Sequence, residues 1–153
     1  MQSRIAGYSY NEWKKLQDEY INDFKTSKRI IRPFRAMIED ILKNETDEDF
    51  RGKTQLSENM LYRLRNQIDE NNPPKMQTLI SVCVGYNLDI ILAQDLLKSL
   101  GLGFNPHKKR DYAYTFLLTR CRGKNIFECN EILKELGIKE SDYLGSRPRN
   151  AKK

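Results

Sequence analysis

Apolar residues recur at three- and four-residue steps along nearly the whole chain, and this is the period of an α-helix. The first stripe predicts an amphipathic helix over about residues 9–27 and consists of Trp13, Leu16, Tyr20 and Phe24. Pro33 suits the first turn of a second helix, whose apolar positions are Phe34, Met37, Ile38, Ile41 and Leu42. No segment alternates with period two, so the pattern predicts an all-α protein with seven or eight helices.

Two short helices are expected between Thr46 and Asn66, each with a side chain that can cap its N-terminus. Thr46 begins the first, with Asp49 three residues later as in a capping box, and Ser57 begins the second. Their shared core would consist of Phe50, Leu56, Leu61 and Leu64. The short break between them, over 54–57, makes the helices cross steeply. The outer face of the second helix is then free to enter a groove.

Four more helices are expected after the polar loop 66–75, which ends in two prolines. One runs from Met76 to near Gly85, and the next from Ile90 to Leu100. Two shorter helices follow, over about 110–121 and 125–137. Their predicted inward stripes are Tyr112, Ala113, Phe116, Leu117 and Cys121, and then Ile126, Cys129, Leu133 and Leu136.

The segment TDEDFRGKTQLSENMLYRLRN, residues 46–66, resembles the helix-turn-helix of phage-repressor-like (xenobiotic-response-element type) transcriptional regulators. The residues that carry the resemblance are Thr46, Phe50, Leu56, Ser57, Leu61 and Leu64. It extends over about 34–100 and implies a lambda-repressor-like five-helix DNA-binding domain with an extra N-terminal helix. The segment DYAYTFLLTRCRGKNIFECNEILKELGI is similar to a C-terminal helix pair found on some bacterial regulators of this type.

Two positions depart from the pattern of that family. Arg51 stands where the first helix usually has a small residue, often alanine, that packs against the second helix. Gln55 stands where the turn usually has glycine, the residue that adopts a left-handed backbone at least cost. A slightly different crossing of the two helices is therefore expected.

The resemblance implies contacts between the second helix and the major groove of double-stranded DNA. The expected base-reading residues are Ser57, Glu58, Asn59, Tyr62, Arg63 and Asn66. Arginine can bond guanine O6 and N7, asparagine can bond adenine N6 and N7, and glutamate can accept from cytosine N4. Contacts to the DNA backbone, which position a protein without reading sequence, are expected from Thr46, Lys53, Arg65 and Lys75. Regulators of this type usually act as homodimers on half-sites about 34 Å apart.

The charge is distributed unevenly along the chain. The net charge is +6, but residues 44–100 carry 6 basic and 9 acidic groups, and residues 101–153 carry 12 and 6. We expect an N-terminal amphipathic helix (1–32), a helix-turn-helix domain (33–103), a C-terminal helical extension (104–145) and a disordered basic tail (146–153). The N-terminal helix or the C-terminal pair would supply a dimer interface or bind a protein partner.

Charge also supports an alternative function. The carboxylates of Glu45, Asp47, Glu48 and Asp49 stand where relatives approach phosphate, so the motif could instead serve as an antitoxin-like or inhibitory protein-interaction module. Excess positive charge is by itself equally compatible with a solvated surface.

Other functional classes are not expected from the sequence. A single histidine, His107, makes histidine-based acid–base catalysis improbable, and no glycine-rich phosphate loop is present, so we expect neither an enzyme nor a cofactor. Cys83, Cys121 and Cys129 lack zinc-site spacing and are expected to be reduced, buried thiols without a metal. No signal peptide or membrane span is apparent, which predicts a cytoplasmic protein.

Overall fold

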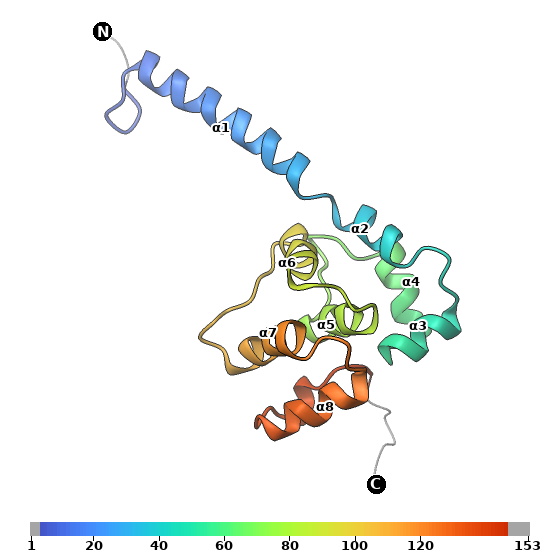
Figure 1. Cartoon of the computed structure of the whole chain (residues 1–153). Coiled ribbons are helices and arrows are strands. Elements are labelled where there is room, and N and C mark those ends of the chain that lie inside the picture. The colour runs from blue at the N-terminus through green and yellow to red at the C-terminus, as the bar shows by residue number, and fades with distance from the viewer. Residues whose placement is uncertain (1–3, 147–153) are drawn as a thin grey trace. The chain divides into compact units, whose positions relative to one another are not determined.

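The computed structural model describes residues 4–146, apart from the side chains of 27–30, and in this part of the chain the named secondary-structure elements are all helices (Figure 1). It contains eight α-helices and one short 3-10 helix, with no β-strand among these residues. The expected all-α class is therefore confirmed. The chain divides into two units, Met1–Pro33 and Phe34–Lys153. The predicted basic tail lies outside the described residues, apart from Ser146.

The first unit consists mainly of helix α1 (Tyr10–Ile30). Ser9 and Glu12 exchange hydrogen bonds as a capping box: the Ser9 N–H donates to Glu12 Oε1 at 2.7 Å, and the Glu12 N–H donates to Ser9 Oγ at 3.2 Å. The apolar stripe is largely exposed, and the rings of Tyr20 and Phe24 stack with centroids 6.2 Å apart. Among the helices of the described residues, none is long and apolar enough to cross a membrane.

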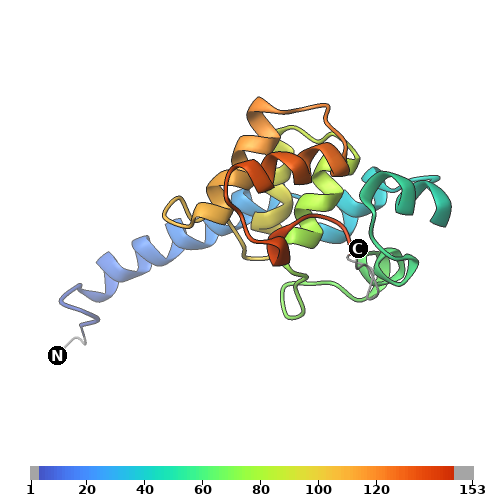
Figure 2. The same cartoon turned by 90° about the horizontal axis from the view of Figure 1, so that it is seen from below.

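The second unit contains the remaining helices. These are α2 (Phe34–Ile41), α3 (Asp47–Thr54), α4 (Glu58–Asn66), α5 (Met76–Gly85), α6 (Ile90–Ser99), α7 (Lys109–Arg120), α8 (Ile126–Glu135) and η1 (Glu140–Asp142). Helix α5 is the centre of the core, because every residue from Thr78 to Cys83 is buried. It packs against α3, α6, α7 and α8. Figure 2 shows α3 on one side of α5 and α7 and α8 on the other.

Helices α3 and α5 approach closely where each one ends. A Cβ atom at Gly85 would lie 2.7 Å from the Lys53 carbonyl oxygen and 2.9 Å from Thr54 Cγ2. Such distances are shorter than van der Waals contact, so only glycine lets the two backbones come together here. This contact positions the end of α3 on the buried helix.

The inward face of α7 differs from the predicted stripe. Tyr112 and Phe116 are 68% and 38% exposed, whereas Tyr114 and Leu118 are buried. The hydroxyl of Tyr114 donates to the carbonyl oxygen of Asp142 at 2.7 Å, which satisfies its one polar group. Both pairs have i, i+4 spacing, so periodicity alone could not distinguish them.

The C-terminal segment, residues 143–146, lies against several elements of the second unit. The Asn130 amide on α8 bonds both backbone groups of Leu144, at 2.8 and 3.1 Å. On α5, Ser81 Oγ accepts from the Gly145 N–H at 2.8 Å, and Gln77 Nε2 donates to the Tyr143 carbonyl oxygen at 2.9 Å. These bonds attach the segment to α5 and α8.

Candidate nucleic-acid interface

Helices α3 and α4 are joined by three residues, Gln55, Leu56 and Ser57. Gln55 has φ +58° and ψ +24°, so the left-handed backbone occurs where the resemblance placed it, although the residue is not glycine. Its Nε2 donates to the Gly52 carbonyl oxygen at 2.9 Å, which partly offsets the cost of this conformation. Arg51 is exposed and thus does not separate the two helices.

Both predicted caps are present. The hydroxyl of Thr46 accepts from the Asp49 N–H at 3.0 Å, and the Asp49 carboxylate accepts from the Thr46 N–H at 3.3 Å. The hydroxyl of Ser57 accepts from the Met60 N–H at 3.3 Å. These bonds satisfy N–H groups that have no partner within the helix, so each helix begins at a defined residue.

The inner face of the pair is apolar and buried, as predicted. Its members are Phe50, Leu56, Leu61 and Leu64, each no more than 5% exposed. The buried hydroxyl of Thr54 donates to the Phe50 carbonyl oxygen at 2.7 Å and accepts from the Leu56 N–H at 3.1 Å. The turn therefore has its polar groups paired inside the core.

The outer face of α4 is open to solvent. Glu58, Asn59, Tyr62 and Asn66 are exposed, and Arg63 is half-buried. The side chains of Glu58, Asn59 and Arg63 form no hydrogen bond or ion pair with the described residues. The Asn66 amide, in contrast, donates to the Tyr62 carbonyl oxygen at 3.0 Å. The structure thus brings the six expected base-reading residues together along one helix and its cap.

Lys53, expected at the DNA backbone, has a partner within the chain. Its Nζ lies 3.1 Å from Glu45 Oε1 and 5.0 Å from the centre of the Tyr86 ring. The Tyr86 hydroxyl donates to the same oxygen at 2.8 Å. Burial, followed by the Glu45 carboxylate, raises the pKa of Tyr86 above its usual range. The positive charge of Lys53 is therefore largely balanced by Glu45.

Arg65, also expected at the DNA backbone, holds the loop between α2 and α3. Its guanidinium donates to the carbonyl oxygens of Leu42 and Glu45, at 3.0 and 3.2 Å. Arg35, which the sequence did not single out, donates to the carbonyl oxygens of Arg65 and Asn66, at 3.0 and 3.3 Å. The two arginines thus bind the end of α4 to the elements that precede α3.

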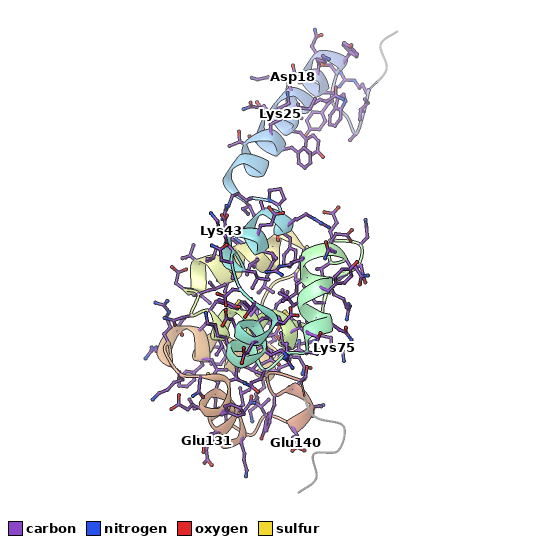
Figure 3. All side chains as sticks on the ribbon, turned by 90° about the vertical axis from the view of Figure 1, so that its right-hand side faces the viewer. Asp18, Lys25, Lys43, Lys75, Glu131 and Glu140 are labelled. Atoms are coloured by element: carbon purple, nitrogen blue, oxygen red, sulfur yellow. The ribbon has the colours of Figure 1, made fainter. Side chains whose placement is uncertain are left out.

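The other two predicted backbone contacts remain at the surface. The exposed hydroxyl of Thr46 is used as the cap of α3. Lys75 is exposed at the start of α5 and lies beside one end of α4 (Figure 3). Lys75 and Arg63 line the same cavity, of about 590 Å³. Sequence reasoning missed this cavity, because its walls come from segments far apart in the chain.

Nothing in the described part of the chain resembles a metal centre, since it contains no group of three or more His, Cys, Asp or Glu residues placed to hold an ion. Cys83 and Cys129 are buried, and Cys121 is half-buried. Burial raises the pKa of the Cys83 thiol to about 12 and that of Cys129 to about 11, so both are neutral at ordinary pH.

Comparison with known proteins gives no information about the function of this surface. No protein-family model, no curated protein and no solved structure matches the chain. The arrangement of α3, the turn and α4, together with the open face of α4, is therefore the basis for a functional proposal.

Proposed function

We propose that the second unit is a lambda-repressor-like helix-turn-helix domain that binds double-stranded DNA through α4 and regulates transcription. The exposed outer face of α4 is the observation that carries this proposal. It presents a carboxylate, an amide, a phenol and a guanidinium on a helix whose opposite face is buried. A helix of this kind fits the major groove, where such groups distinguish base pairs.

The C-terminal segment ends close to this surface. The Ser146 N–H donates to the Gln55 carbonyl oxygen at 2.7 Å, so the segment ends at the turn. The sequence that follows Ser146 is RPRNAKK, with four basic residues. Basic groups that neutralise phosphates release counterions and thereby increase affinity for DNA. We extend the proposal to a homodimer that binds two half-sites about 34 Å apart.

One observation favours a second candidate, a protein-interaction module without DNA binding. Lys53 pairs with Glu45, and Arg65 bonds backbone carbonyl oxygens, so two of the expected phosphate contacts are occupied within the chain. Glu58 also adds negative charge to the open face of α4. An antitoxin-like or inhibitory partner would use this face to contact protein instead.

Selection of bound fragments from a pool of random duplex DNA, followed by fluorescence anisotropy across a salt series, separates the two candidates. DNA binding predicts a selected sequence and a steep fall of log K with log salt. Arg63→Ala is expected to cost about 1–3 kcal/mol of binding free energy and to relax specificity at one base pair. Arg120→Ala, which removes an exposed arginine at the end of α7, is the matched control.

Failure to select any duplex at low salt would contradict DNA binding and favour the interaction module. Equal losses of affinity in the Arg63 and Arg120 variants would also count against readout by α4. Sedimentation equilibrium of the free protein and of its complex tests the dimer separately.

A further inference from the structure

The cavity beside α4 has features of a small-molecule site. It lies between α4, the loop that ends in Pro73-Pro74, the start of α5 and the C-terminal segment. Its apolar walls are Leu56, Met60, Pro73 and Pro74. The volume of about 590 Å³ falls within the roughly 300–1,000 Å³ of typical ligand pockets.

The charged groups that line the cavity are cationic only. They are the guanidinium of Arg63 and the ammonium of Lys75, and no carboxylate lines the cavity. Neither cation forms an ion pair with a described residue. Helix α5 also begins here without a side-chain cap, so its first N–H groups are available to an acceptor. Both features favour an anion.

Thr78 adds a polar group to the wall of the cavity. The residue is only 5% exposed and lines the cavity. Thr78 stands in the first turn of α5, so the residue four positions earlier, Pro74, lies outside the helix and its carbonyl oxygen is not in the helical position to accept from the hydroxyl. Among the described residues, none forms a hydrogen bond with the Thr78 hydroxyl. Since no buried side-chain oxygen of the described residues lacks a partner, this hydroxyl is reached from solvent and is available to bond a molecule in the cavity.

We propose that this cavity binds a small organic anion, a carboxylate or a phosphate ester with a compact apolar body. Its anionic oxygens accept hydrogen bonds from Thr78, Arg63 and Lys75 and lie at the positive end of α5. Its apolar body contacts Leu56 and Met60. The buried position of Thr78 and the wall formed by Gly145 and Ser146 favour a small molecule over a nucleic-acid backbone.

One consequence rests on the proposed function. A bound anion would hold the Arg63 guanidinium, the same group that we assign to a base edge. The ligand would therefore lower the affinity of the protein for its selected duplex. In this way the cavity would couple a small-molecule signal to DNA binding.

The binding test uses the full chain without DNA, so its outcome does not depend on the proposed function. The probes are phenyl phosphate, benzoate, inorganic phosphate and the neutral benzyl alcohol, followed by amide chemical shifts in NMR titrations. We expect phenyl phosphate or benzoate to saturate a site and shift the resonances of Thr78 and its neighbours. Inorganic phosphate and benzyl alcohol should each bind at least about tenfold more weakly. Inorganic phosphate lacks the apolar body, and benzyl alcohol lacks the anionic group.

Two variants, each with one polar contact of the native side chain removed, test the assigned contacts. Thr78→Val replaces the hydroxyl with a methyl group, and Arg63→Gln removes the guanidinium charge. Each should weaken phenyl phosphate binding about tenfold, with thermal melting used to confirm the fold. Lys98→Gln, an exposed site at the end of α6, should leave binding unchanged.

Several results would overturn the site. These are unchanged binding in Thr78→Val, equal affinity for benzyl alcohol and phenyl phosphate, or equal affinity for inorganic phosphate and phenyl phosphate. Shifts of Thr78 produced only by duplex DNA would also overturn it and would assign the cavity to the DNA backbone. A duplex titration with and without saturating phenyl phosphate then tests the coupling alone.

Discussion

The backbone N–H of Ser146 donates to the carbonyl oxygen of Gln55 at 2.7 Å, which joins the C-terminal segment to the turn between α3 and α4. The neighbouring Gly145 has φ +79°, and a Cβ atom on it would lie 2.9 Å from the Cβ of Gln55. The left-handed residue of the turn is thus packed against a second left-handed residue. Because α8 holds this segment through Asn130, the extension and the turn form one packed unit.

Gly145→Ala tests whether this packing matters for stability. The added methyl group would overlap Gln55, and alanine is also strained in a left-handed backbone conformation. We therefore expect a loss of about 2–4 kcal/mol in the free energy of unfolding. Gly123→Ala is the control, because Gly123 has φ +94° with open space around it and should lose only about 1 kcal/mol. Urea denaturation of both variants measures the difference. Equal losses would show that the contact with Gln55 contributes nothing.

Gly85→Ala tests the close approach of α5 to the end of α3. We expect a loss of about 1–3 kcal/mol, since the methyl group would overlap the backbone oxygen of Lys53. Gly52→Ala, inside α3 with nothing within 4 Å, should instead stabilise the protein by about 0.5–1 kcal/mol. Thermal unfolding should therefore show shifts of opposite sign. A gain in both variants would contradict the close packing of α3 on α5.

Arg65→Ala separates a structural role from a DNA contact. The change removes the donor to the carbonyl oxygens of Leu42 and Glu45, and the Leu42 oxygen then keeps only the Glu45 N–H, so we expect a loss of about 1–3 kcal/mol in unfolding free energy. Arg65→Lys keeps the charge but removes the planar group that reaches both oxygens, and it should also be destabilising. Unchanged stability in Arg65→Ala, with weaker binding to DNA, would instead assign the side chain to phosphate.

The buried thiols predict a loss of stability at alkaline pH. Burial raises the pKa of Cys83 from 9.0 to about 12. The contribution of the neutral thiol to the free energy of unfolding is therefore complete below about pH 9 and decreases as the pH rises toward 12. Between about pH 8 and about pH 10.5, this group lowers the free energy of unfolding by about 2 kcal/mol. Cys83→Ala should lose correspondingly less over that interval, as measured by urea denaturation at both pH values. Identical pH dependence in the two proteins would show that Cys83 is not buried as described.

Thiol accessibility gives a companion measurement. At about pH 8 we expect Cys121, which is half-buried, to react with a thiol reagent before Cys83 and Cys129. Peptide mapping after brief alkylation of the native protein identifies the order. Early modification of Cys83 would contradict its burial.

Local features of the sequence were enough to predict the helices and both caps of the α3–α4 pair. Thr46 and Ser57 act through hydrogen bonds to residues three positions away, and such contacts depend on nearby sequence alone. The inner stripe of α4 was equally clear, because Leu61 and Leu64 repeat with the helical period. The open outer face of α4 follows from the same periodicity.

Tertiary structure alone decided which partners the remaining side chains have. Periodicity could not choose Tyr114 over Tyr112 for the core, and no local pattern linked Arg65 to the loop before α3. The sequence pattern also did not predict that Ser146 would contact Gln55 or that Thr78 would line a cavity. Helix formation depends on bonds between near neighbours in sequence, whereas these relationships arise only when distant segments pack into one core.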